Sequence, residues 1–446
     1  MSSAVINIFK IPDLRKRVLF TLFMLIVYRI GAHIPVPGIN VEALRDYFVE
    51  AEKSGVLDFF DLFAGGALKR FTIFALGIMP YISSSIIVDL LKTVFPYLNE
   101  LSKEGAEGYK KLNQYIKYGT VLLCTIQGLG LVFWMRSMRT ADGTPVVPDG
   151  SGVGFTIMAV ISIVTGTMVL MWFGELITER GIGNGISLII MAGIVVRLPQ
   201  SFYETMKKIA DTGEPIVGII LIGLFFLVVA ASILLTLGTR RIPVQYGKRV
   251  VGATAVQRTA QYIPLRVNAA GVIPIIFASA IIVFPSQLVR MLGVSTNVYL
   301  NKIQYWLTPG QIPYIVLYSA LVIFFCFFYT SLRFNPTEIA DNLKKYGGFI
   351  PGIRPGQNTA DYLMGVLNRV TLSGSIFLAL ISIIPDFIIR IWPEQVPINM
   401  AYLFGGTSLL IVVGVALDTL KQIESQLLMR HYDGFLGSKK KIQGRY

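Results

Sequence analysis

The hydrophobic residues of this chain come in runs long enough to cross a lipid bilayer. A membrane-spanning helix needs about 20 predominantly apolar residues, and ten segments of roughly that length alternate with polar connections. The pattern therefore predicts an all-α polytopic membrane protein. The ten predicted spans cover residues 18–35, 73–92, 115–135, 153–174, 182–198, 215–238, 268–290, 311–332, 370–391 and 399–417.

One apolar piece, residues 57–72, is too short to be a span. It carries Gly65 and Gly66 in its middle, and a helix of that length would not cross the hydrocarbon core. A segment can enter the membrane without crossing it where the surrounding protein, and not lipid, covers its backbone. We therefore expect this piece to be re-entrant or half-inserted.

Two spans begin with matching sequences that contain helix breakers. Gly77-Ile78-Met79-Pro80 opens the second span, and Gly271-Val272-Ile273-Pro274 opens the seventh. Taken alone, the match is compatible with chance similarity between two apolar helices. Matched Gly/Pro-interrupted segments in the two halves of a membrane protein, however, point to its functional centre.

The position of the match divides the chain into two halves of five spans. Residues 1–200 hold spans one to five, and residues 201–446 hold spans six to ten. Because five is odd, the second half starts on the opposite side of the membrane from the first. The matched spans are then antiparallel, as in an inverted repeat.

Composition supports a membrane protein and excludes several kinds of chemistry. Hydrophobic residues make up 54% of the 446 residues and charged residues 15%, against about 45–50% and 25% in soluble domains. Cys124 and Cys326 lie inside predicted spans, and His33 and His431 lie far apart, so neither a disulfide framework nor a metal site is expected. No GxxxxGK[ST] loop is present. We predict no cofactor and no enzyme activity.

The net charge of +14 has two explanations, topology and an anionic partner. The N-terminus, the even-numbered connections and the C-terminus carry more than twice the Lys and Arg of the odd-numbered connections. The positive-inside bias then places both termini in the cytoplasm. Connection 239–268 has six basic and no acidic residues. This positive charge is larger than the positive-inside bias requires, and it predicts an anionic docking partner. Connection 333–369 is also long, and long connections are often functional.

Ionisable residues in the spans are few and lie towards helix ends, where contact with loops or water reduces their cost. We identified Arg29, Asp89, Lys92 and Asp386. A secondary transporter of the five-plus-five inverted type would need charged groups near the bilayer midplane, which these residues do not supply. A membrane scaffold would explain the long connections, but not the residues described next.

Large aliphatic residues recur beside the Gly and Pro breaks, and each by itself is an ordinary packing residue. As a set they suit a hydrophobic constriction, which can gate a pore by excluding water. They are Ile78, Ile82, Ile186, Ile190 and Ile276. Polar residues near the same spans have two interpretations. They form ordinary hydrogen bonds between packed helices, or they form a weakly bonded seam between two helices that move apart when the protein opens. They are Ser83, Ser84, Ser85, Gln127 and Asn268.

Five motifs in order along the chain resemble the SecY family, the channel-forming subunits of the bacterial protein translocon. The resemblance covers essentially the whole chain. The motifs are Gly77–Leu91, Phe63-Ala64-Gly65-Gly66-Ala67-Leu68, Thr178-Glu179-Arg180-Gly181-Ile182-Gly183-Asn184-Gly185-Ile186-Ser187, Pro351-Gly352-Ile353-Arg354-Pro355-Gly356 and Phe404-Gly405-Gly406-Thr407-Ser408-Leu409-Leu410-Ile411.

The resemblance implies an hourglass channel between the two halves. The pore ring maps onto Ile78, Ile82, Ile186, Ile190, Ile276 and Ile411. The plug maps onto residues 58–68, including Asp58, Phe63, Gly65, Gly66 and Leu68. A lateral gate, which releases signal sequences and membrane segments into lipid, maps onto spans two and three against seven and eight, with Ser83, Gln127 and Asn268.

The resemblance also implies partners and a location. It predicts SecE and SecG subunits, the SecA motor ATPase, the ribosome and signal-sequence-bearing polypeptides as partners, in a bacterial cytoplasmic (inner) membrane. Docking maps onto Arg240, Arg241, Lys248, Arg249 and Arg354. The loop tip Gly252-Ala253-Thr254-Ala255-Val256 departs from the family, because only Arg258 is charged nearby.

Overall fold

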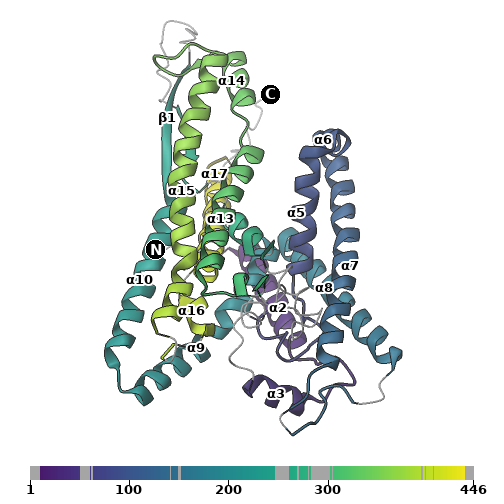
Figure 1. Ribbon diagram of the computed structural model, residues 1–446. Coiled ribbons are helices and arrows are strands. Elements are labelled where there is room, and N and C mark those ends of the chain that lie inside the picture. The colour runs from purple at the N-terminus through teal and green to yellow at the C-terminus, as the bar shows by residue number, and fades with distance from the viewer. Residues whose placement is uncertain are drawn as a thin grey trace, which may run out of the picture. The chain divides into compact units, whose positions relative to one another are not determined.

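The computed structural model describes residues 11–50, 61, 64–140, 142–148, 152–246, 261–268, 271–279, 281–282, 302–303, 305–392, 395–396, 398–404 and 406–436 (Figure 1). The chain divides into two compact units, Met1–Ser201 with Ile411–Tyr446, and Phe202–Leu410. The first boundary lies one residue from the predicted division into halves. The second boundary lies inside the last helix, and the assignment of the halves stays a prediction.

Helices dominate both units. The first unit contains α2 (Pro12–Gly31), α3 (Val41–Glu50), α5 (Met79–Val94), α6 (Pro96–Lys103), α7 (Ala106–Arg136), α8 (Val153–Arg180) and most of α9 (Gly185–Thr212) and α17 (Thr407–Leu436). The second unit contains α10 (Pro215–Leu237), α13 (Ile312–Arg333), α14 (Pro336–Lys345), α15 (Gln357–Ile391), α16 (Ile398–Phe404), β1 (Thr239–Tyr246), β2 (Gln261–Arg266) and β3 (Gly348–Phe349).

Seven helices in the described part of the chain are long and apolar enough to cross a membrane. They correspond to predicted spans three, four, five, six, eight, nine and ten. The first and second predicted spans fall on α2 and α5. The seventh, residues 268–290, is described only at 268, 271–279 and 281–282.

The two matched Gly/Pro segments have the same local conformation. Gly77 has a φ of 57° and Gly271 a φ of 67°, a left-handed region that glycine enters at little cost. In each copy the helix begins two residues later, with Pro80 or Pro274 in its first turn, where a proline needs no hydrogen-bond donor. The second span therefore becomes helical only at Met79, six residues later than predicted.

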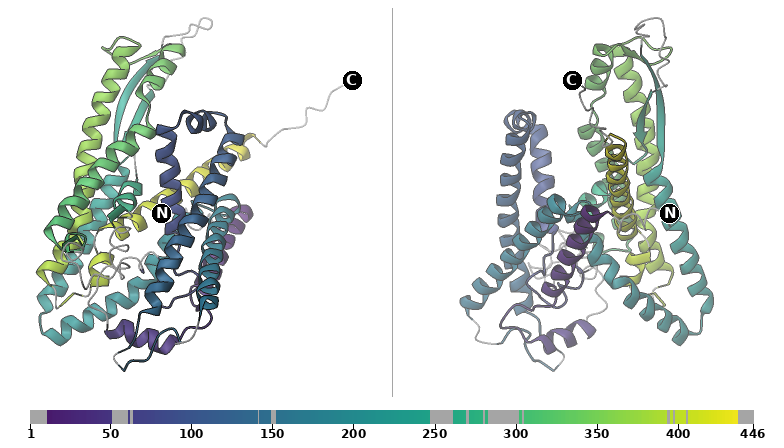
Figure 2. Two further views of the ribbon diagram at one scale, coloured as in Figure 1. Left: turned by 45° about the vertical axis from the view of Figure 1, so that its right-hand side comes forward. Right: turned by 180° about the vertical axis from the view of Figure 1, so that it is seen from behind.

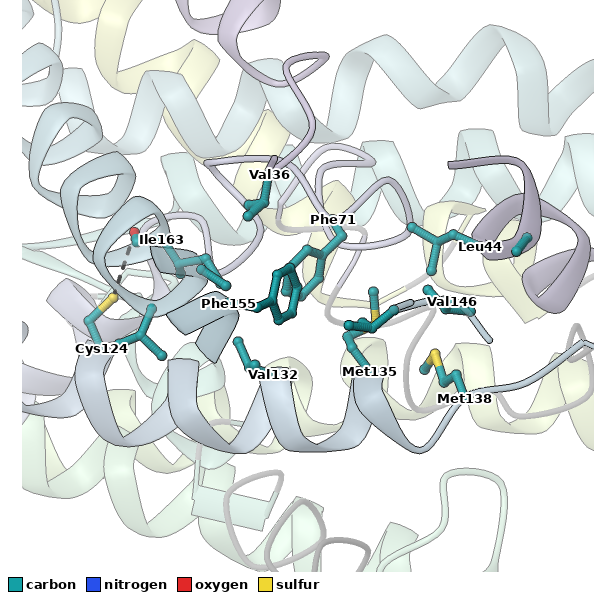
Figure 3. Packing of buried hydrophobic residues seen from close by; sticks show 14 residues of the cluster. Val36, Leu44, Phe71, Cys124, Val132, Met135, Met138, Val146, Phe155 and Ile163 are labelled. Carbon is teal, nitrogen blue, oxygen red and sulfur yellow. Dashed lines mark hydrogen bonds between the residues drawn. The ribbon is translucent and has the colours of Figure 1, made fainter. Parts of the chain in front are cut away.

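In the first unit, α5 and α7 form a hairpin whose turn contains α6, as the blue helices of Figure 1 show. Beside them, one buried cluster joins the turns after α2 to α7 and α8. Figure 3 shows the Phe71 and Phe155 rings together between Val36 and Met135. Half of its buried residues lie in connections, so the core of the first unit extends beyond its predicted spans.

In the second unit, α13 and α15 lie side by side, as the two green helices of Figures 1 and 2 show. β1 pairs antiparallel with β2, from Thr239 opposite Arg266 to Val244 opposite Gln261, and β3 pairs with the other end of β1. Ile242 and Leu265 pack with Leu363 of α15. The long connections therefore contain a folded sheet, and α15 begins at Gln357, well before its predicted span.

Candidate functional site

Four of the predicted ring isoleucines lie at the starts of two helices in the first unit. Ile78 is the N-cap residue of α5, and Ile82 follows one turn later, with its N–H 3.1 Å from the Ile78 carbonyl oxygen. Ile186 and Ile190 lie in the first two turns of α9. The spacing of four places the members of each pair on one helix face.

The start of α9 is fixed by a side-chain cap. The Asn184 Oδ1 atom accepts the backbone N–H groups of Ile186 at 3.1 Å and Ser187 at 3.3 Å, which satisfies donors that a helix end leaves open. A Cβ atom at Gly174 of α8 would lie 2.7 Å from the Ile186 Cγ1 atom. Cap and close packing together position Ile186.

The other two predicted ring residues are buried, as are Ile78 and Ile190, whereas Ile82 and Ile186 are half-buried. Ile411 lies in α17 in the first unit, and Ile276 lies in the second unit. The Ile276 carbonyl oxygen accepts a hydrogen bond of 2.8 Å from the Ser279 hydroxyl. Because the six isoleucines belong to two units, their closure into one ring stays a prediction.

The described part of the predicted plug is Asp61, in a helical conformation, and the turns that begin at Ala64. Asp58 and Phe63 lie outside the described residues, whereas residues 64–70 are turns and not helix. Gly65 and Gly66 have φ values of 62° and 92°, and a Cβ atom at Gly65 would lie 2.9 Å from the Gly193 Cα atom of α9. Leu68 is buried. The glycine pair therefore permits close approach to α9.

A charged cluster that no sequence pattern predicted holds the same turns. Asp61 is 0% exposed and forms an ion pair with Arg197 of α9. Its Oδ1 atom accepts the backbone N–H groups of Leu68 and Lys69, both at 3.0 Å. Arg29 of α2 donates to the Gly65 carbonyl oxygen at 2.9 Å.

Two sequence signals for this cluster were available. Arg197 lies inside the fifth predicted span but is not among the predicted intramembrane charges. Asp61 lies in the short apolar piece and is not among them either. An ionisable residue in an apolar segment usually has a partner of opposite charge, and that rule would have suggested the pair.

The other predicted intramembrane charges have local partners. Asp89 and Lys92 form an ion pair of 2.7 Å within one turn of α5. Asp386 of α15 is 1% exposed and accepts the Gly310 N–H at 2.9 Å, which is the loop contact expected near a helix end. The described residues contain no group of His, Cys, Asp and Glu side chains that could hold a metal ion.

The predicted gate residues belong to both units. Ser83 and Gln127 are half-buried in α5 and α7 of the first unit. Asn268 follows β2 in the second unit, and its Oδ1 atom is buried with no hydrogen-bond partner within the described part of the chain. A seam that joins these residues stays a prediction.

The predicted docking residues are only partly described. Arg240 and Arg241 are exposed on β1, and the Arg241 guanidinium lies 4.8 Å from the centre of the Tyr262 ring on β2. Arg354 is exposed in the turns before α15. Lys248, Arg249 and the loop tip lie outside the described residues. Because side chains alternate along a strand, Arg241, Arg266 and Tyr262 share one exposed face of the sheet. Arg240 falls on the opposite face, the one whose Ile242 and Leu265 pack on α15.

Comparison with known proteins finds similarity along nearly the whole chain. The SecY family model matches residues 72–420. The protein translocase subunit SecY of Streptomyces galbus is 46% identical over 442 residues, which cover 98% of this chain and 100% of the relative. The protein of the same name from Escherichia coli K12 is 45% identical over 426 residues, which cover 95% and 94%.

Solved structures share the fold at low sequence identity. "The structure of a protein conducting channel" matches with a TM-score of 0.62 and 18% identity, covering 96% of this chain and 95% of that one. "Sec61 in the Canine ribosome-channel complex from the endoplasmic reticulum" matches with a TM-score of 0.61 and 17% identity at the same coverage. With the family model and the close relatives, these matches show that the chain belongs to the SecY family.

Proposed function

We propose that this chain conducts unfolded secretory polypeptides across the membrane and releases signal sequences and membrane segments into lipid. Support comes from full-length similarity to protein translocase subunits and from the fold of a protein-conducting channel. The observation that carries the proposal is the shared break at Gly77 and Gly271, because each unit begins a helix there beside a ring isoleucine.

An isoleucine ring suits a channel that must seal without selecting its cargo. Aliphatic side chains exclude water and ions from a narrow constriction. They also form no specific hydrogen bonds, so they can surround a passing chain without reading its sequence. Ile78, Ile82, Ile186, Ile190, Ile276 and Ile411 form this constriction in the proposal.

The energy for transport comes from a partner in this proposal, because the sequence has no GxxxxGK[ST] loop to bind a nucleotide. The basic face of β1 and β2 suits an anionic partner, and a ribosome accompanies the Sec61 channel in one matched structure. Docking of the SecA motor and assembly with SecE and SecG rest on the family resemblance. The charge bias of the connections supports an inner-membrane protein with both termini in the cytoplasm.

The ring is tested in liposomes that contain the channel with its partner subunits. Ile82→Asn and Ile276→Asn together should let ions leak through the idle channel, because polar side chains favour water in the constriction. Ile87→Asn is the matched control, since Ile87 is exposed on the same helix α5. Tight sealing by the double variant, with normal transport of a preprotein, would contradict the ring.

The lateral gate is tested with a reversible bond across the proposed seam. Cysteines replace Ser83 and Asn268 in a chain whose buried Cys124 and Cys326 are changed to serine. Oxidation should block preprotein transport, and reduction should restore it. Transport at the normal rate through oxidised, bonded channels would overturn the gate assignment.

A further inference from the structure

The charged cluster around Asp61 has no role in a constriction made of isoleucine. Asp61, Arg29 and Arg197 all belong to the first unit, as do the turns that they contact. A buried ion pair is costly unless its geometry and its additional hydrogen bonds offset the desolvation. Its presence in an apolar environment therefore calls for a reason beyond stability.

One end of the turn segment, from Phe71 onwards, is fixed by backbone pairing and packing. The Phe71 carbonyl oxygen accepts the Val36 N–H at 2.9 Å, and the Ile73 N–H donates to the Ile34 carbonyl oxygen at 3.1 Å. The Phe71 ring is fully buried in the cluster of Figure 3. Phe71 also has a φ of 43°, which is strained for a bulky residue.

The other end, Asp61 with residues 64–68, is held in a different way. The Asp61 carboxylate closes the turns on themselves through the Leu68 and Lys69 N–H groups and joins them to α9 through Arg197. Arg29 adds a hydrogen bond to the Gly65 carbonyl oxygen. Polar contacts with two helices therefore join this end to the rest of the unit.

Positive charge exceeds negative charge at this place. Burial, with the positive charges of Arg29 and Arg197, lowers the pKa of Arg70. Arg29 and Arg197 therefore both lie near Arg70, and Asp61 is the carboxylate that the described residues place among them. Asp61 offsets their repulsion, so its charge matters more to the local arrangement than the charge of any one arginine.

We propose that the Asp61–Arg197 ion pair is a latch that holds Asp61 and residues 64–70 against α9 in the idle channel, with Phe71 as the fixed pivot. This inference rests on the proposed function. When the pair is intact, the segment stays on α9 and contributes to the seal. When either charge is lost, the segment leaves α9 and the idle channel conducts ions.

A double-mutant cycle on the ion pair tests the latch. Asp61→Asn keeps an amide oxygen for the Leu68 and Lys69 N–H groups but removes the charge, and Arg197→Met removes its partner. Each should raise the ion leak of idle channels in liposomes about tenfold, since removing one partner of a buried pair is strongly unfavourable. Asp61→Asn should have the larger effect, because it removes the carboxylate that the described residues place among three arginines.

The coupling between the two changes is the decisive result. The double variant should leak no more than Asp61→Asn alone, because the second change removes an interaction already lost. Lys117→Met is the matched control, since Lys117 forms an ion pair of 2.8 Å with Glu175 in the same unit. Wild-type sealing by Asp61→Asn, or effects that simply multiply, would overturn the latch.

A second measurement detects the segment itself. Ala67 is fully buried, so an Ala67→Cys variant in a chain with Cys124→Ser and Cys326→Ser should react slowly with a water-soluble maleimide. Asp61→Asn should accelerate that reaction severalfold, and an unchanged rate would contradict the latch.

The failure of the latch can be distinguished from the failure of the channel proposal. If the ring variants leak and the wild type transports preprotein, a negative latch result leaves the channel proposal intact. If the wild type transports nothing, the channel proposal itself fails.

Discussion

The Ser84 hydroxyl of α5 donates a hydrogen bond of 2.7 Å to the Ile116 carbonyl oxygen of α7. Gly119 allows the two helices to approach closely here, because it has no side chain. A Cβ atom at this position would lie 2.4 Å from the Ser84 Oγ atom. Ser84 therefore contributes to packing inside the first unit. It differs in this respect from Ser83, which we assign to the seam.

Gly119→Ala should lower the melting temperature of the purified channel, because its methyl group collides with Ser84 and overpacking costs about 1–3 kcal/mol. Adding Ser84→Ala should recover part of the loss, since it removes the colliding oxygen. Thermal unfolding in detergent measures both. Gly223→Ala is the control, because a Cβ atom there would meet nothing within 4 Å. Equal losses in Gly119→Ala and the double variant would contradict the packing argument.

Shortening Ile82 should weaken the seal in graded steps. Ile82→Val removes one methylene and Ile82→Ala three carbons, so the predicted constriction widens progressively and admits more water. Ion flux through idle channels should rise from wild type to valine to alanine. Ile87→Ala, at an exposed position of the same helix, should behave as wild type. A flat series would exclude Ile82 from the constriction.

Asp386 should be more important as a hydrogen-bond acceptor than as a charge. Asp386→Leu leaves the Gly310 N–H without its partner, at a cost of about 1–3 kcal/mol, and the melting temperature should fall. Asp386→Asn keeps an acceptor oxygen and should lose less. Asp361→Asn, at an exposed position of the same helix, provides the baseline. A leucine variant as stable as wild type would refute this role.

Arg241→Gln should weaken binding of an anionic partner to the sheet. The change removes a positive charge and the contact with the Tyr262 ring. Cosedimentation with ribosomes across a salt series should show lower affinity and a shallower dependence on salt. Lys302→Gln is the control, because Lys302 lies in a connection predicted on the other side of the membrane. Equal losses in both variants would indicate a nonspecific charge effect.

The helices and their breaks were predictable because each depends on local sequence. Apolar length predicted the positions of most helices, and Gly77 and Pro80 marked a real break because φ preference and the missing donor act within one turn. The start of α5 was placed too early, since apolar length does not distinguish buried turns from helix.

Other features depend on contacts between distant segments, and no window of sequence contains them. β1 includes Pro243 and two arginines, so strand propensity does not favour it, yet pairing with β2 and packing of Ile242 stabilise it. The ion pair between Asp61 and Arg197 is similar, because its partners lie in different predicted elements. The local sequence indicated this ion pair only through the presence of charged residues in apolar segments, where they are unusual.

The contact between the start of α9 and α17 sets an order of events during synthesis. The Gly183 N–H donates to the Gln422 side-chain oxygen at 2.9 Å, across 239 positions of the chain. That bond forms only after residue 422 has been made, so the first unit waits for the whole second unit to emerge before its own packing is complete. A chain truncated before α17 would therefore leave the first unit incompletely packed, even though residues 1–201 are all present.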